Sequence, residues 1–133
     1  MTAFVDTTMV VRYLTGDPPD QARTAASILD GVELLITDVV LVESAYVLRS
    51  FYDVPRDVIV DHLIALVRKA NISPFAMDEG SVIDALLMCR GSGRVSFADA
   101  MIWAAAHSSG AEAVYSLNRR FPEVDVTVRR EPA

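Results

Sequence analysis

Three acidic residues stand beside apolar stretches, and carboxylates are among the few side chains that bind metal ions or transfer protons. Asp6 ends the apolar run 3–5, Glu43 lies within the apolar segment 39–48, and Asp99 lies at the start of the apolar segment 98–104. If these segments are helical, most residues three or four positions away from Glu43 and Asp99 are apolar, so we expect both carboxylates on buried faces. An unpaired buried carboxylate is unfavourable. The three acids therefore require either cationic partners or one shared metal ion.

The predicted topology brings four oxygen-bearing side chains toward one edge of a sheet. Asp6 and Asn118 follow predicted strands, and the carboxyl ends of parallel strands share an edge. Asp99 reaches this edge from a helix start, and Glu43 does so if the first turns of its helix lean over the edge. Carboxylates about 4 Å apart repel by about 4 kcal/mol at an effective dielectric of about 20, so clustering requires protonation or a divalent cation. Oxygen ligands favour Mg²⁺ or Mn²⁺ over zinc.

The composition predicts one globular domain, residues 1–133, with a substantial core. The chain has 133 residues, a mass of 14.5 kDa and 52% hydrophobic residues. Cys89 is its one cysteine, which excludes an internal disulfide and indicates a small core residue in a reducing compartment. His62 and His107 belong to different predicted helices, so they form no zinc-binding set and are expected to be structural or surface residues.

The net charge of −6 argues against non-specific binding of long duplex nucleic acid. Arginine accounts for eleven of the twelve cationic residues, and arginine can grip phosphate bidentately even where cations are few. Arg119–Arg120 and Arg129–Arg130 are the dense spots, and the second pair is expected to be ordinary solvated surface. The beginning of the chain carries no basic leader and no apolar run approaches about 18 residues, so we expect a cytoplasmic protein without membrane association.

Short strand-like runs alternate with longer helical patterns throughout, which is typical of an α/β fold. We expect a three-layer α/β/α arrangement around a mainly parallel sheet of about five strands. The predicted strands are 3–6, 33–37, 72–75, 112–116 and 126–128. The predicted helices are 8–14, 20–29, 39–52, 56–70, 79–89 and 97–107.

Local signals supply details and one alternative. Asp38 is expected to cap the helix that follows it. Ser96 followed three residues later by Asp99 is a capping-box variant, which would explain Asp99 without any chemistry. The helical aromatic residues are expected to be core or dimer contacts rather than platforms for stacking bases; they are Tyr13, Tyr46, Phe51, Tyr52, Phe97 and Trp103.

Four ordered blocks resemble the PIN domain family, and specifically the VapC-type toxins. They are residues 4–18 (FVDTTMVVRYLTGDP), 37–43 (TDVVLVE), 96–100 (SFADA) and 114–121 (VYSLNRRF). A single Asp-x-Thr would be weak, but the resemblance covers nearly the whole chain in the family's order. It implies a metal-dependent endoribonuclease that is inhibited by a VapB-type antitoxin and is commonly a homodimer.

The resemblance also implies roles for individual residues. Asp6, Glu43 and Asp99 match the three catalytic, metal-binding acids, and Asn118 matches a fourth metal position that is often aspartate. Asparagine keeps an oxygen donor but removes a charge, so we expect one tightly bound Mg²⁺, replaceable by Mn²⁺, with a second ion joining only alongside RNA. The supporting hydroxyls are expected to be Thr8 and Ser116.

Metal-activated water would cleave RNA without using its 2′-hydroxyl, which predicts products with 5′-phosphate and 3′-hydroxyl ends. Arg119 and Arg120 are candidates for contacting RNA phosphates near the predicted site. Arg12 and Arg94 are weaker candidates. The helical hairpin 39–67 offers a groove for an antitoxin helix, and an inserted antitoxin cation could block the acids. The RNA target and its cleavage sequence stay open.

Three alternatives remain. Glu43 could pair with a buried Arg49 or Arg12, which would make it structural. A phosphoaspartate enzyme also uses an aspartate at a strand end, but such enzymes want a lysine late in the sheet, and Lys69 lies on a mid-chain helix. A PIN-like scaffold that binds RNA or a protein without cutting is favoured by Asn118 and by the acidic net charge.

Overall fold

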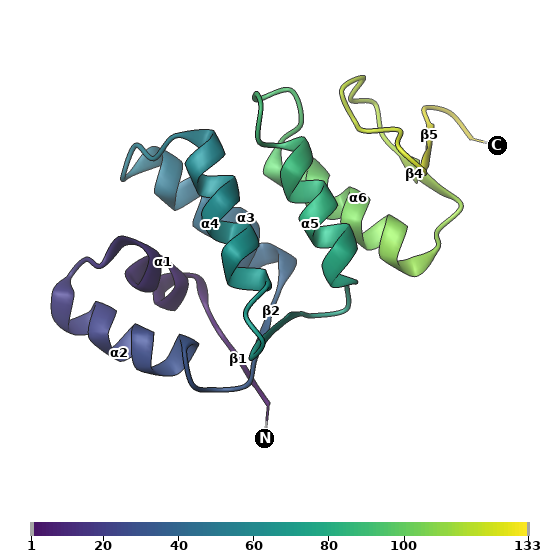
Figure 1. The fold of residues 1–133 in the computed structure, drawn as a ribbon. Coiled ribbons are helices and arrows are strands. Elements are labelled where there is room, and N and C mark those ends of the chain that lie inside the picture. The colour runs from purple at the N-terminus through teal and green to yellow at the C-terminus, as the bar shows by residue number, and fades with distance from the viewer. Residues whose placement is uncertain (1, 133) are drawn as a thin grey trace.

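The structure, a computed structural model, describes residues 2–132 and contains eleven helices and strands (Figure 1). The helices are α1 (Thr7–Thr15), α2 (Pro19–Leu29), α3 (Asp38–Ser50), α4 (Arg56–Val67), α5 (Glu79–Met88) and α6 (Phe97–Ser109). The strands are β1 (Ala3–Phe4), β2 (Leu34–Ile36), β3 (Ile72–Pro74), β4 (Ala113–Tyr115) and β5 (Thr127–Arg129). The predicted α/β class is confirmed. Within the described chain, no helix is long and apolar enough to cross a membrane.

The strands form two parallel sheets, so the prediction of one five-stranded sheet is wrong. β1, β2 and β3 pair in that order, with Ala3 opposite Leu34 and Leu34 opposite Ile72. β4 and β5 pair separately. In Figure 1 the β4–β5 pair lies at the end of the molecule opposite α1 and α2, with the other helices between them. The two-residue strand β1 offers little backbone for a second neighbour.

Side-chain caps fix where the helices near the strand ends begin. Asp6 caps α1, and Ser96 caps α6. Thr37 caps α3 by accepting a hydrogen bond from the Val40 amide, so the prediction that Asp38 is the cap is wrong. Asp38 is instead the first residue of α3, where a negative charge also favours the helix.

The end of α4 is earlier than predicted because the chain must turn into β3. Arg68 is the C-cap of α4, whereas the pattern predicted helix as far as residue 70. The side-chain amide of Asn71 donates to the backbone oxygens of Leu29 and Val32, which holds this turn against the end of α2. Long-range bonds of this kind leave no periodic signal in the sequence.

Trp103 joins the β4–β5 region to the main core. Its side chain is 2% exposed, and the indole N–H donates to the Val124 oxygen at 2.8 Å. Phe121 and Val126 are also buried, so the loop 116–126 contributes side chains to the core in addition to this hydrogen bond. The prediction that helical aromatics are packed in the core or in a dimer therefore fits Trp103. Within this chain Tyr46 lies outside the core, because it is 65% exposed.

Arg56 ties three helices together at the start of α6. It is the first residue of α4, and its guanidinium donates to the backbone oxygens of Cys89 and Val95. The same group lies over the Phe97 ring, 4.6 Å from the ring centroid. Burial raises the pKa of the Cys89 thiol to about 11, although the nearby Arg56 charge opposes this rise. Arg56 thereby holds the segment that leads into α6 and toward Asp99.

Arg56→Lys should lower the free energy of unfolding by about 1.5–3 kcal/mol, the range for hydrogen bonds made by charged groups. A lysine keeps the charge but lacks the planar fork that reaches two carbonyl groups at once. Urea unfolding of the variant beside Arg68→Lys, an exposed control at the opposite end of α4, measures the difference. Equal midpoints for Arg56→Lys and the wild type would contradict the clamp.

Candidate metal-binding and catalytic site

Asp6 lies just after β1 and begins α1. Its Oδ1 accepts a hydrogen bond from the Met9 amide at 3.0 Å, which satisfies one of the free N–H groups of the first helical turn. The residue is exposed, and Oδ2 has no hydrogen-bond partner among the described residues. Asp6 can therefore cap its helix and still present one oxygen to a ligand.

Glu43 lies in the second turn of α3 and contacts the start of α1. Its Oε1 accepts a hydrogen bond from the Thr7 hydroxyl at 2.8 Å. The prediction that Glu43 is buried is wrong, because the residue is exposed and its helical neighbours Val39 and Tyr46 are 60% and 65% exposed. The core-facing side of α3 is instead formed by Val40, Leu41, Ser44, Ala45 and Leu48.

Asp99 is half-buried in the first turn of α6. Its backbone N–H donates to the Ser96 hydroxyl at 3.0 Å, so Ser96 caps the helix as the sequence suggests. The carboxylate has a different partner, since its Oδ2 accepts a hydrogen bond from Asn118 Nδ2 at 2.7 Å. The capping alternative explains the backbone at Asp99 but not the placement of its carboxylate.

The loop after β4 orients Asn118 through one contact to its backbone and one to its side chain. Its backbone N–H donates to the Ser116 hydroxyl at 3.0 Å, and its Oδ1 accepts from the Arg120 amide at 3.0 Å. These contacts leave Nδ2 directed at Asp99. An aspartate could not donate that hydrogen bond, so the amide is specifically suited to this contact.

The three acids have no cationic partner within residues 2–132. The ion pairs there join Lys69 to Asp30, Arg90 to Asp61 and Arg130 to Glu123. Arg12 instead donates its Nε to Gln21 Oε1 at 2.8 Å. The alternative in which Arg49 or Arg12 neutralises Glu43 is therefore wrong.

The donor chemistry fits a hard divalent cation, because each acid keeps an oxygen outside any hydrogen bond between described residues. The spacing is looser than the sequence predicts. Across residues 2–132, no three acidic, histidine or cysteine side chains lie close enough to hold one metal ion. Asp6, Glu43, Asp99 and Asn118 thus come from four segments of the chain, but the three carboxylates do not converge on one point.

The supporting residues differ partly from the predicted set. Thr8 is exposed and, with Asp6 and Arg12, lines a hollow of about 270 Å³ between α1 and α2. Thr7, rather than Thr8, bonds an acid. Two threonines follow Asp6, so the sequence offers no local reason to choose between their hydroxyl groups. Ser116 supports Asn118 as described above.

The predicted phosphate-binding arginines lie on several sides of these acids. Arg119 and Arg120 are exposed in the loop that carries Asn118. Arg94 is exposed just before α6, and its amide donates to the Ser92 hydroxyl. Arg12 lines a hollow together with Asp6, one of the three acids. Sequence reasoning missed Arg56, although a cation in the first turn of a helix is unfavourable and therefore signals a tertiary partner.

Residues 3–126 match the PIN domain family, so the chain belongs to that family. PIN domains are typically metal-dependent nucleases, and they commonly use divalent metal ions. No curated protein matches the chain. The family and the oxygen-rich site agree on a nuclease in general terms.

Asn118→Asp should destabilise the metal-free protein by about 1–4 kcal/mol, the repulsion of two carboxylates about 4 Å apart across the range from water to an effective dielectric of 20. The substitution replaces a hydrogen bond to Asp99 with a like charge. The variant should regain stability at low pH, because protonating one of the two carboxyl groups removes the repulsion. The difference in unfolding free energy between variant and wild type should therefore grow as the pH rises. Chemical denaturation in EDTA at several pH values measures this, and a pH-independent effect would contradict it.

Proposed function

We propose that this chain is a metal-dependent endoribonuclease of the VapC type, the toxin of a toxin–antitoxin pair. The observation that carries the proposal is the orientation of Glu43 and Asp99 by neutral donors, with no cation paired to them or to Asp6 among residues 2–132. Negative charge left unneutralised in this way suits a divalent cation, which could in turn bind an anionic phosphate. Family membership supports the nuclease class, and the four sequence blocks support the VapC type.

The roles of the residues follow from their contacts. Asp6, Glu43 and Asp99 would hold Mg²⁺ or Mn²⁺, with Asn118 directing Asp99 and Thr7 directing Glu43. The bound cation would lower the pKa of a water molecule and stabilise charge on the phosphoryl group and the leaving oxygen. Side chains already fixed by hydrogen bonds need little reorganisation when substrate arrives. Arg119 and Arg120 are available beside Asn118 for RNA phosphates.

A VapB-type antitoxin and a second copy of the chain are the protein partners of this proposal. An antitoxin cation inserted among the acids would compete with both metal and RNA. A second candidate function is a PIN-like module that binds RNA or a partner without cutting. The absence of a ready three-ligand group within residues 2–132 favours that candidate.

Asp6→Asn, Glu43→Gln and Asp99→Asn should each reduce RNA cleavage by at least about 100-fold, the scale of losing one electrostatic stabiliser. EDTA should abolish cleavage by the wild type. Sequencing of the cleaved ends should find 5′-phosphate and 3′-hydroxyl groups. Asp84→Asn, an exposed change on α5, is the matched control and should cleave normally. Cyclic 2′,3′-phosphate ends, or cleavage that persists in EDTA, would contradict the mechanism.

Mg²⁺ or Mn²⁺ should raise the thermal midpoint of the wild type, because a ligand that binds only the folded state stabilises it by about 2.7 kcal/mol at roughly 100 times its Kd. Asp99→Asn should lose this response and Asp84→Asn should keep it. Differential scanning calorimetry without RNA measures the effect independently of catalysis. Equal stabilisation of all three proteins would mean that the metal binds elsewhere.

A further inference from the structure

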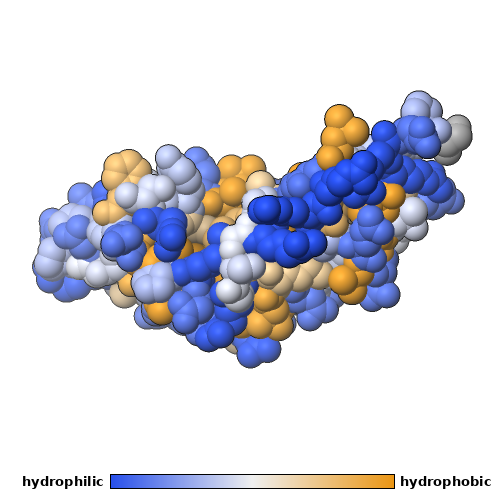
Figure 2. Space-filling view, turned by 90° about the horizontal axis from the view of Figure 1, so that it is seen from above, coloured by the Kyte–Doolittle hydropathy of each residue, from blue (hydrophilic) through white to orange (hydrophobic). Residues whose placement is uncertain are grey.

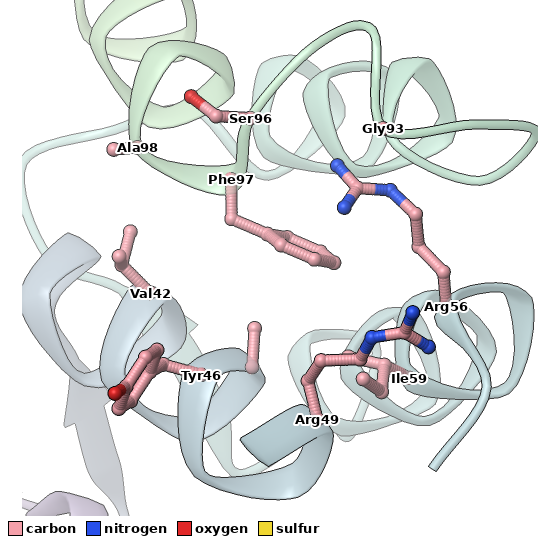
Figure 3. Close-up of a pocket in the computed structure, with 10 residues that line it drawn as sticks. Val42, Tyr46, Arg49, Arg56, Ile59, Gly93, Ser96, Phe97 and Ala98 are labelled. Carbon is pink, nitrogen blue, oxygen red and sulfur yellow. The ribbon is translucent and has the colours of Figure 1, made fainter. Parts of the chain in front are cut away.

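A pocket of about 290 Å³ opens where α3, α4 and the start of α6 meet (Figure 3). Its walls include Val42, Tyr46 and Arg49 from α3, Arg56 from α4, and Phe97 and Ala98 from α6. In Figure 3 the two guanidinium groups lie on one side of the opening, and Val42 and Tyr46 lie on the other. The pocket thus combines cationic and apolar walls.

The two arginines give the pocket a local positive charge in an acidic protein. Among residues 2–132, no acidic side chain lines it. Arg49 is exposed, and it forms neither a hydrogen bond nor an ion pair through its guanidinium with the described residues. Arg56 uses Nε and Nη2 to hold carbonyl oxygens, which leaves its Nη1 without a partner among residues 2–132. Guanidinium groups of this kind are suited to a phosphate.

The pocket adjoins the proposed catalytic acids. Val42 and Ala98 also line a second hollow, of about 250 Å³, whose walls include Glu43. The two hollows therefore follow one another along the line where α3 and α6 meet. Arg49 lies six positions after Glu43, a rise of about 9 Å along a helix. A strand with one phosphate near Glu43 could therefore extend toward Arg49.

We propose that this pocket binds a nucleotide of single-stranded RNA next to the bond that is cut. Arg49, assisted by Arg56, contacts the phosphate, and the base or ribose packs against Val42, Tyr46 and Phe97. The pocket has room for one nucleotide-sized group rather than a duplex. Aromatic and cationic walls are the usual means of holding single strands without sequence preference. This inference rests on the proposed ribonuclease function and identifies where its substrate extends.

A second copy of the chain fits the pocket less well than RNA does. A two-fold axis through this patch would bring four guanidinium groups together without an acidic lining to offset them. The face seen from above Figure 1 is mainly hydrophilic with separate hydrophobic patches (Figure 2). Around the two hollows Val39, Tyr46 and Ile102 are 60%, 65% and 50% exposed, so the apolar surface there is made of a few side chains. An acidic peptide would match the charge, but the continuity with Glu43 favours the strand that the acids would cut.

The test compares Arg49→Gln with Arg68→Gln, which removes the same charge at the opposite end of α4. A fluorescent single-stranded RNA of about 12 nucleotides is titrated with each protein in EDTA, and binding is measured by fluorescence anisotropy at several salt concentrations. Arg49→Gln should weaken binding about tenfold, as expected for one charge-assisted contact, and reduce the salt slope by about 0.7. Arg68→Gln should bind as the wild type does.

Two more variants separate charge from packing. Arg49→Lys should keep the salt slope, whereas Tyr46→Ala should weaken binding without changing it. In cleavage assays Arg49→Gln should raise KM more than it lowers kcat. Unchanged thermal midpoints of these exposed-residue variants would show that folding is intact.

The remaining outcomes distinguish this inference from the proposed function. Unchanged RNA affinity in Arg49→Gln would overturn the subsite while leaving the nuclease proposal intact. Loss of dimerisation or of acidic-peptide binding, with normal RNA affinity, would overturn it in favour of a protein partner. RNA binding that depends on Arg49 in a wild type that cuts nothing would support the subsite and refute the nuclease. No RNA binding by the wild type in EDTA would overturn the subsite, whereas the nuclease proposal would be overturned only by a wild type that also cleaves no RNA with Mg²⁺ or Mn²⁺.

Discussion

The arrangement of the candidate site depends on hydrogen bonds from neutral groups to negative ones. A guanidinium or ammonium group beside Glu43 or Asp99 would orient the carboxylate but would also neutralise it. The hydroxyl of Thr7 and the amide of Asn118 orient these carboxylates and leave their charges in place. Thr7 directly follows Asp6, so one turn of chain caps α1 and aligns Glu43. The charge that would attract a cation is therefore maintained by groups that carry none.

Single hydrogen bonds of this kind can orient side chains only if the backbone beneath them is well fixed. Short helix caps, buried aromatic groups and one arginine provide this support. Ser96 fixes the first turn of α6, and Arg56 holds the preceding segment through two carbonyl groups. On the other side of Asp99, Trp103 anchors the loop that carries Asn118. The contact between Asn118 and Asp99 thus lies between two independently supported segments.

The sequence predicted local features well and long-range pairings less well. Helix and strand positions follow from periodicity and caps, and all eleven elements occur near their predicted places. The split into two sheets could not be predicted, because strand pairing depends on contacts between distant segments. The error at Glu43 is one of phase, since apolar neighbours on a helix indicate a core only when that face points inward. Val39 and Tyr46 are apolar and yet exposed.

The charges along α3 and α4 explain why one arginine of the pocket is structural and the other is available. Asp38 lies in the first turn of α3 and Arg49 in the last, so each complements the helix dipole. Arg49 consequently needs no tertiary partner to be tolerated at its position. Arg56 lies at the start of α4, where a positive charge opposes the dipole, and it acquires carbonyl partners instead. Helix polarity therefore leaves an accessible cation beyond Glu43 on the same helix, while the neighbouring cation stabilises the segment that leads to Asp99.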